Sequence, residues 1–418
     1  MGRIHFNYIA AEFNNKNMKL PVIFLVVTFI LAGCGNSEKK LIRKANRIQA
    51  SILTVDTHCD TPMELADPGF DMGIRSSDGC VDFPKMIEGG LNAEFFAIFT
   101  GQGPRNDSTY NIVHKKAIDI FNAIIQNVEK NSSVACIATT PDDAYRLKKQ
   151  GKIAAFIGME NGYPIGKDLT RIKQYFDLGA RYITLAHTKN NDICDSSTDP
   201  EGQENGGLSS FGTQVVKEMN RLGMMVDISH ISDKSFFDVL KVTASPVIAS
   251  HSSCRALCGS PRNLSDDMLV ALKENGGVIQ ICILGNFLKT PEPNPELDQK
   301  LKELKTKYGE YDSLNDSTKK IVRNEFKNIL KTYEKPATVK DVVDHIDHVV
   351  QVIGIDYVGI GTDFDGGGGV DGCRTAADMK NITIELLRRG YSKQDITKIW
   401  GGNIMRVMQK VEDYAKKM

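Results

Sequence analysis

The segment ILTVDTHCD, residues 52–60, places a histidine and an aspartate directly after a short apolar run. The run has the length and composition of a buried parallel strand. Because side chains two positions apart on an extended chain project to the same side, His58 and Asp60 can face one ion. Imidazole with carboxylate is a ligand pair suited to Zn²⁺, but a single pair of this kind also occurs by chance.

The same pattern recurs along the chain. Apolar runs at residues 153–158, 182–186, 224–229, 247–250 and 358–362 are each followed, at once or after one residue, by an acid or a histidine. Scattered core histidines would not all fall at strand ends, whereas a (β/α)8 barrel gathers the C-terminal ends of its strands into one mouth. The side chains expected at this mouth, beside the first pair, are Glu160, His187, His230, His251 and Asp363.

Two further runs of strand character, residues 93–99 and 277–283, complete the eight strands of such a barrel. Segments with helical periodicity separate the strands, and this alternation is typical of parallel sheets. The sequence therefore predicts an α/β fold, a (β/α)8 TIM barrel of the metal-dependent hydrolase type. The helical segments lie at residues 112–128, 169–178, 213–222, 234–240, 266–274 and 339–352.

Composition is that of an ordinary globular domain. The 418 residues are 41% hydrophobic and 25% charged, with a formal net charge of +0. No basic stripe with interleaved aromatic residues is present, which argues against a nucleic-acid partner.

The N-terminus has the pattern of a targeting segment. Residues 20–32 are apolar but too short to span a bilayer comfortably, and they end in Leu-Ala-Gly-Cys at 31–34. This quartet resembles the bacterial lipobox, in which the cysteine is lipidated, here Cys34. We expect residues 1–34 to be a signal peptide, with Met18 as an alternative start, and 35–44 a polar tether. The location that follows is a bacterial cell envelope, with the lipid-anchored enzyme facing the periplasm or exterior.

Residues 289–336 interrupt the barrel pattern after its seventh strand. They are rich in Lys, Glu, Asp and Asn and contain a helical stretch at 317–333. Loops that follow barrel strands emerge on the catalytic face, so the segment is predicted to be a helical insertion there. A lid, a dimer contact and a solvated extension are all compatible with it, and the last is our starting expectation.

Two further histidines, His345 and His348, follow a helical pattern before the last strand. Because helices form the outer ring of such a barrel, packing or surface roles are expected for both. The cysteines other than Cys34 contain no CxxC pair, which argues against a thiolate zinc site.

Taken in order, the strand ends and their neighbours form a set of motifs that is specific as a whole although each piece is weak. The set is DTHCD (56–60), GMENG (158–162), YITLAH (182–187), VDISH (226–230), SHSS (250–253), PRNL (261–264) and GTDFDG (361–366). Over about residues 45 to 415 the chain resembles the membrane (renal) dipeptidases of the amidohydrolase superfamily, as a bacterial lipoprotein member.

The resemblance implies a binuclear zinc dipeptidase. His58 and Asp60 would bind one Zn²⁺, and His230 and His251 the second. Glu160 and a hydroxide would bridge the two ions, and the hydroxide would attack the peptide bond of a dipeptide to release two amino acids. A homodimer is a further expectation.

Three residues are expected to act on the substrate. By the resemblance, His187 would contact the substrate and stabilise the oxyanion. Asp363 would move the proton from the attacking water to the leaving amine, although Asp365 also stands at this strand end. Arg262 would bind the free C-terminal carboxylate, because a planar guanidinium pairs with it bidentately.

Two other functions stay open. Another binuclear amidohydrolase, such as an N-acyl amino-acid deacylase or a lactonase, would keep the metal ligands but need not keep Arg262 and His187. A surface binding lipoprotein without catalysis would use the barrel alone, and it predicts a damaged site. Every expected ligand is present in the sequence, so the binding protein ranks last.

Overall fold

The computed structural model describes residues 38–66, 69–290, 293–309, 314, 316–333 and 336–418. It separates into two units, residues 1–44 and Ala45–Met418. The expected signal peptide with Met18 and Cys34 lies outside the described residues. Residues 38–51 are helical, so the described part of the predicted tether begins a helix. None of the helices in the described ranges has the length and apolar character needed to cross a membrane.

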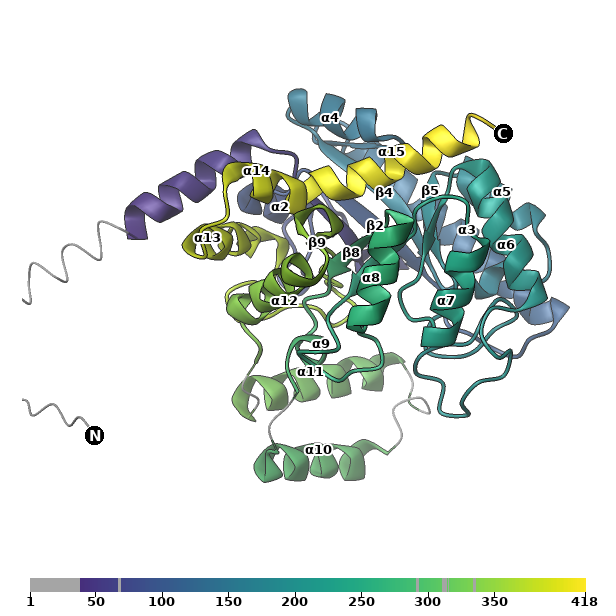
Figure 1. Ribbon diagram of the computed structural model, residues 1–418. Coiled ribbons are helices and arrows are strands. Elements are labelled where there is room, and N and C mark those ends of the chain that lie inside the picture. The colour runs from purple at the N-terminus through teal and green to yellow at the C-terminus, as the bar shows by residue number, and fades with distance from the viewer. Residues whose placement is uncertain (1–37, 67–68, 291–292, 310–313, 315, 334–335) are drawn as a thin grey trace, which may run out of the picture. The chain divides into compact units, whose positions relative to one another are not determined.

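Parallel strands form a barrel in the second unit, as predicted (Figure 1). Each strand pairs with the next along the path, and the last returns to the first. At that seam the Asp60 amide donates to the Phe364 carbonyl at 2.8 Å, and the Asp363 amide donates to the His58 carbonyl at 3.0 Å. The strands in order are β1 (Val55–Cys59), β2 (Ala93–Phe99), β4 (Ile153–Glu160), β5 (Ala180–Thr184), β6 (Met225–Asp227), β7 (Ile248–Ser252), β8 (Val278–Ile281) and β9 (Val358–Ile360).

One strand was not predicted. β3 (Ala135–Ile137) pairs in parallel with the beginning of β4, where Ala135 lies opposite Ile153. Further along β4, from Ile157 onward, β5 is the partner. A strand of three residues is too short to produce a recognisable apolar run, so sequence periodicity could not reveal it.

Helices follow the strands and surround the barrel (Figure 1). Four of them follow a serine, Ser209, Ser232, Ser265 or Ser392, whose hydroxyl accepts a backbone amide of the first turn. All six predicted helical segments lie within or overlap observed helices. The helices are α2 (Phe83–Gly89), α3 (Asp107–Lys130), α4 (Pro141–Lys149), α5 (Thr170–Asp177), α6 (Ser210–Leu222), α7 (Asp233–Val242), α8 (Asp266–Asn275), α9 (Gly285–Leu288), α10 (Pro295–Tyr308), α11 (Asp316–Tyr333), α12 (Val339–Val352), α13 (Lys380–Arg388), α14 (Lys393–Thr397) and α15 (Asn403–Ala415).

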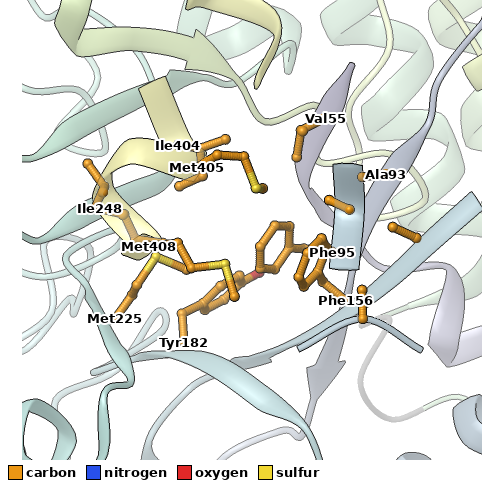
Figure 2. Close-up of a cluster of buried hydrophobic side chains, with 14 of the residues drawn as sticks. Val55, Ala93, Phe95, Phe156, Tyr182, Met225, Ile248, Ile404, Met405 and Met408 are labelled. Carbon is orange, nitrogen blue, oxygen red and sulfur yellow. The ribbon is translucent and has the colours of Figure 1, made fainter. Parts of the chain in front are cut away.

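An apolar cluster fills the end of the barrel where the strands begin. Phe95, Phe156 and Tyr182 point inward from β2, β4 and β5 and pack together with Met405 and Met408 of α15 (Figure 2). The rings of Phe95 and Phe156 stack with centroids 4.6 Å apart. This core closes the floor of the barrel and leaves the opposite end, where the strands finish, for polar side chains.

The predicted insertion contains two helices, α10 and α11. They pack mainly against each other, and in Figure 1 they lie side by side beyond α9. The Asn294 side-chain amide donates to the Tyr333 carbonyl at 2.6 Å, which joins the two ends of the pair. The helical insertion after the seventh barrel strand is therefore present. We call residues 294–333 the helical hairpin.

Candidate metal centre

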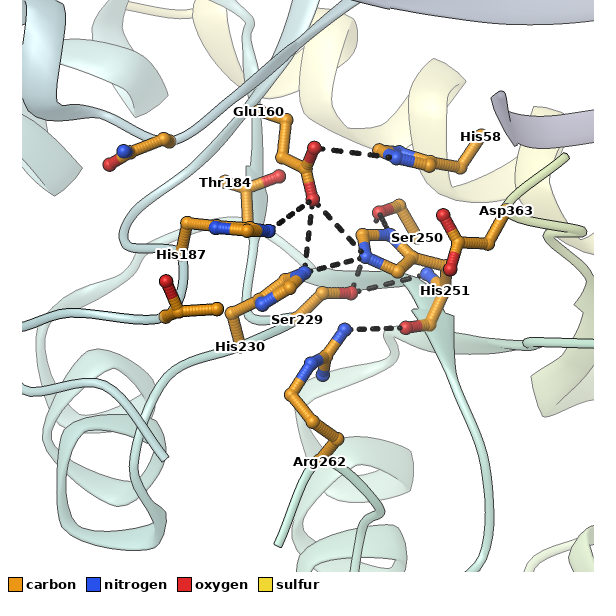
Figure 3. Close-up of polar contacts among 12 residues, drawn as sticks. His58, Glu160, Thr184, His187, Ser229, His230, Ser250, His251, Arg262 and Asp363 are labelled. Carbon is orange, nitrogen blue, oxygen red and sulfur yellow. Dashed lines mark hydrogen bonds and ion pairs between the residues drawn. The ribbon is translucent and has the colours of Figure 1, made fainter. Parts of the chain in front are cut away.

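The carboxylate of Glu160 lies at the centre of the barrel mouth, at the end of β4 (Figure 3). One of its oxygens, Oε1, is 3.0 Å from His230 Nε2, 3.5 Å from His251 Nε2 and 3.6 Å from His187 Nε2. The other, Oε2, is 3.8 Å from His58 Nε2. The two oxygens of one carboxylate thus face different histidines.

The first pair of predicted ligands lies on the Oε2 side. His58 Nε2 is 3.7 Å from Asp60 Oδ2. These two residues and Asp363 offer ligand atoms that all lie within 4.8 Å of one another. His58, Glu160 and His251 form a second such group, and Glu160, His187 and His230 a third. The structure therefore brings the predicted ligands together, with His187 and Asp363 at their edge.

Unpaired polar atoms support a cation at this place. His58 Nε2 and Asp60 Oδ1 are buried and have no hydrogen-bond partner. His230 Nε2 and His251 Nε2 point at each other across 2.8 Å. Buried polar atoms without a partner are unfavourable unless a cation or another ligand binds beside them. Imidazole nitrogens and carboxylate oxygens are the donor set of a zinc site, so the residues present fit this metal.

Burial and charge prepare these side chains for a cation. Burial, together with the positive charge of Arg262, lowers the pKa of His230 well below its ordinary value, and burial with the charge of His58 does the same for His251. Both rings are therefore neutral, as metal ligands must be. Burial, reinforced by the charge of Asp60, raises the pKa of Glu160 well above its ordinary value. The anionic form of such a carboxylate is destabilised unless a positive charge lies beside it.

Backbone strain is concentrated at the same place. The non-glycine residues with positive φ in the described chain are Asn161 (74°), His230 (71°), Asp363 (61°) and Asp365 (65°). His230 and Asp363 are predicted site residues, Asn161 directly follows Glu160, and Asp365 lies two positions after Asp363. Left-handed backbone at such residues costs energy, and it persists where the surrounding structure holds a side chain in a required direction. No sequence pattern predicted these positive φ angles.

Asp363 and Asp365 have different surroundings. Burial raises the pKa of Asp363 to about 7, and the negative charge of Asp60 adds to the effect. The Cys282 thiol donates to its Oδ2 at 3.9 Å. Asp365 instead accepts the Cys80 amide and the Thr61 hydroxyl, both at 2.7 Å. The geometry places Asp363 at the ligand cluster and gives Asp365 a structural task in joining loops.

Arg262 is a buried cation at the edge of the cluster (Figure 3). Its Nη2 donates to the His251 carbonyl at 3.1 Å and its Nη1 to the Ser252 hydroxyl at 3.4 Å, while its Nε has no partner. Among the described residues no carboxylate forms an ion pair with it. A buried guanidinium without a carboxylate is costly, so an anionic group of a ligand would satisfy it.

His345 and His348 lie away from the cluster, on α12. His345 is buried, where its ring accepts the Cys254 amide at 2.9 Å and contacts the Leu288 carbonyl at 2.9 Å. His348 pairs with Asp266 at 2.7 Å. Both have the packing and surface roles expected from their helical position.

The family model for the membrane dipeptidases, peptidase family M19, matches residues 42–418. The chain belongs to this family. A dipeptidase of Claviceps purpurea, tcpJ, is 34% identical over 343 residues, which are 81% of this chain and 70% of the relative. The dipeptidase verJ of Clonostachys rogersoniana is 32% identical and covers 90% of this chain and 89% of its own length.

A solved structure agrees. The probable dipeptidase PvdM from Pseudomonas aeruginosa superimposes with a TM-score of 0.79 at 31% identity, over 90% of this chain and all of that one. The resemblance inferred from the motifs is thereby confirmed, and with it the fold. Members of a metallopeptidase family need a metal, and in this member the His, Asp and Glu side chains at the strand ends are positioned to hold one.

Some members of the site were missed by the sequence argument. The Ser250 hydroxyl is 2.8 Å from His251 Nδ1 and donates to Asp227 at 2.6 Å, and the Thr184 hydroxyl donates to the same carboxylate at 2.5 Å. This buried chain orients the imidazole from behind. Each of the three residues lies within a quoted motif, but the motifs gave no indication of this supporting role.

Proposed function

We propose that the chain is a binuclear zinc dipeptidase that hydrolyses dipeptides into two amino acids. The observation that carries the proposal is the Glu160 carboxylate, whose two oxygens face separate groups of metal-type ligands. A carboxylate in this position can bridge two ions. His58 and Asp60 would hold one zinc ion, and His230 and His251 the other.

Two zinc ions would act as Lewis acids and would lower the pKa of a water toward neutrality, so that no side-chain nucleophile is required. Asp363, which lies beside the ligands of the first ion, would accept the proton of the attacking water and deliver it to the leaving amine. His187 would stabilise the negative charge on the carbonyl oxygen. Burial, with the nearby charge of Arg262, lowers the pKa of His187 to about 4 and keeps the ring neutral, so it would act as a hydrogen-bond donor.

Arg262 restricts the substrate to short peptides. Its buried guanidinium would bind a C-terminal carboxylate, which fixes the length of chain beyond the cleaved bond. A dipeptide satisfies this arrangement, whereas a lactone supplies no carboxylate. Dipeptidase names among relatives at 32–34% identity support the same substrate class.

Metal analysis tests the zinc part of the proposal. We expect two zinc ions per chain, and Glu160→Gln should prevent binuclear assembly because a neutral amide cannot bridge two cations. Glu94→Gln is the matched control, since Glu94 is a fully buried carboxyl on the neighbouring strand whose pKa is raised by burial, and an amide imitates its neutral form. Full activity and unchanged metal content in Glu160→Gln would refute the bridging role.

A substrate panel tests the reaction. Dipeptides, including L-Ala-D-Ala and L-Ala-D-Glu, should be hydrolysed far better than dipeptide amides, N-acyl amino acids or lactones. Arg262→Ala should lose roughly 2 to 4 kcal/mol of transition-state stabilisation on dipeptides, and little on dipeptide amides. Arg262→Lys keeps the charge but not the planar fork, and it should recover only part of the loss. Equal use of dipeptides and their amides by the wild type would contradict the role.

We further propose that Cys34 carries a lipid and anchors the enzyme at a bacterial envelope membrane. The support is the lipobox-like quartet at 31–34, and more than one acyl chain gives stable anchoring. In detergent partitioning the wild type should enter the detergent phase, and Cys34→Ser should remain an unprocessed precursor. Equal solubility of the two, with the N-terminal methionine retained in both, would reject the anchor and leave the dipeptidase assignment intact.

A further inference from the structure

The tyrosine behind the first predicted ligand has a defined hydrogen-bond arrangement. The Tyr182 hydroxyl is 2.8 Å from His58 Nδ1 and donates to the Thr57 carbonyl at 3.1 Å. Both Tyr182 and His58 are fully buried. The opposite ring nitrogen, His58 Nε2, faces Glu160 and Asp60 and has no hydrogen-bond partner.

The chemistry of these groups fixes the direction of the hydrogen bonds. A carbonyl oxygen can only accept, and a phenol has one proton to donate. If that proton points to the Thr57 carbonyl, the phenol oxygen must accept from His58, and the imidazole proton is on Nδ1. The reverse arrangement would leave two oxygens facing each other without a proton and would place a ring proton on Nε2, the atom aimed at the metal ligands.

Packing holds the phenol in this position. The Tyr182 ring lies against Phe95, with centroids 5.6 Å apart, in the core at the barrel floor (Figure 2). Gly158 on the adjacent strand provides the space, because a Cβ at this position would lie 2.0 Å from the Tyr182 ring. The Gly-Met-Glu motif therefore does more than carry Glu160: its glycine admits the tyrosine that supports His58.

We propose that Tyr182 is a positioning residue that holds the His58 proton on Nδ1 and thereby leaves Nε2 free to bind the metal. The inference rests on the proposed zinc site and deepens it. Hydrogen bonds of this kind behind a ligating histidine orient the ring and strengthen metal binding. Tyr182 connects the apolar floor of the barrel to the metal centre at its mouth.

The chain offers a matched control for the experiment. Tyr175 on α5 is also buried, and its hydroxyl lies 2.7 Å from His114 Nδ1 and donates to the Pro164 carbonyl at 3.2 Å. This arrangement is of the same kind but is not part of the ligand cluster. Tyr182→Phe and Tyr175→Phe each remove one buried hydroxyl and keep the aromatic ring, so a general loss of stability would affect both.

Zinc affinity and the position of the ring proton are the measurements. In chelator competition with the full-length chain, Tyr182→Phe should bind one zinc about 10- to 100-fold more weakly, and Tyr175→Phe should bind as the wild type does. Nitrogen-15 NMR of the zinc-loaded wild type, assigned with His58→Gln, should show a slowly exchanging proton on His58 Nδ1 that Tyr182→Phe loses.

Unchanged zinc affinity in Tyr182→Phe, or a wild-type ring proton on Nε2, would overturn the inference. A parallel affinity loss in Tyr175→Phe would also overturn it, because it would show a general effect of lost stability. Failure of the proposed function is distinguishable: if the wild type bound no zinc, the zinc site would be wrong. Without metal the pKa of His58 is about 10, so the ring carries both protons at neutral pH. NMR of the zinc-free chain would then still show whether the proton on Nδ1 exchanges slowly in the wild type and faster in Tyr182→Phe.

Discussion

Two aspartates that stand two positions apart, Asp363 and Asp365, show how far single residues can differ in role. Both have positive φ, but only Asp363 lies within the ligand cluster. Asp363→Asn should lower kcat by about 10²- to 10⁴-fold, because the amide can neither accept nor deliver the catalytic proton. Steady-state kinetics on a dipeptide, together with zinc content, provides the measurement.

Asp365→Asn is the matched control for this prediction. It changes the acceptor for the Cys80 amide and the Thr61 hydroxyl, so it should lower Tm while kcat per folded molecule stays within a few-fold of the wild type. If the two variants lost kcat equally, or if Asp365→Asn lost more, the assignment of the proton-transfer role to Asp363 would be wrong.

Sequence reasoning located the side chains of the site but not the backbone and support that aim them. His58, Glu160, His230 and His251 could be predicted because each ends an apolar run, and parallel strands bring such ends together. The hydroxyl behind His58 could not be predicted, because Tyr182 lies on another strand and meets His58 only in the folded barrel. Positive φ at His230 was equally hidden, since it reflects tertiary constraint rather than local preference.

Elements were predictable in proportion to their length and periodicity. The eight barrel strands carry apolar runs, and the long helices α3 and α12 repeat apolar residues at helical spacing. β3, with three residues, carries no such signal. The helical hairpin was visible in composition and in the periodicity of its second helix. Its lack of extensive packing on the barrel could be learned only from the structure.

Because the helical hairpin packs mainly on itself, its removal should leave the barrel intact. Replacing residues 295–333 with a short Gly-Ser linker is feasible, since Asn294 and Tyr333 are joined by a hydrogen bond and their backbones lie near each other. We expect Tm within a few degrees of the wild type, two zinc ions per chain, and kcat/KM on dipeptides within about threefold, because few barrel contacts are lost.

Circular dichroism melts, zinc analysis and kinetics on the shortened chain check this expectation. As a control, the same linker length inserted at the exposed turn at Gly390, away from the mouth, should be tolerated to a similar degree. A large fall in kcat/KM with normal Tm and zinc content would show that the hairpin takes part in catalysis as a lid.

At the scale of the whole molecule, the barrel joins an apolar floor to a mouth in which charged groups are gathered away from water. Burial, with the charge of Asp60, raises the pKa of Asp363 to about 7. For His58, burial lowers the pKa, but the charges of Glu160 and Asp60 outweigh it and raise it to about 10. Without metal, both groups bind protons more tightly when folded than when unfolded.

The sign of the pH dependence follows from this linkage. The stabilising contribution of each raised group is complete below its unfolded pKa, near 4 for the aspartate and 6.5 for the histidine, and it is lost as pH rises through the folded values of about 7 and about 10. The lowered pKa values of His230 and His251 have the opposite effect: they reduce stability only as pH falls below about 6.5. The metal-free protein should therefore lose stability between pH 6.5 and 8 at these groups.

Zinc should reverse this trend. Its ligands must be deprotonated, so its affinity rises with pH, and a ligand that binds only the folded state stabilises it by about 2.7 kcal/mol at a free concentration 100 times Kd. The difference in Tm between zinc-loaded and chelator-treated protein should thus be larger at pH 8 than at pH 6.5. Calorimetric melts at fixed free zinc measure it, with Glu160→Gln as the variant that should show a much smaller difference. If this difference in Tm became smaller as pH rose, the buried carboxylates and His58 would not be the groups that release protons when the metal binds.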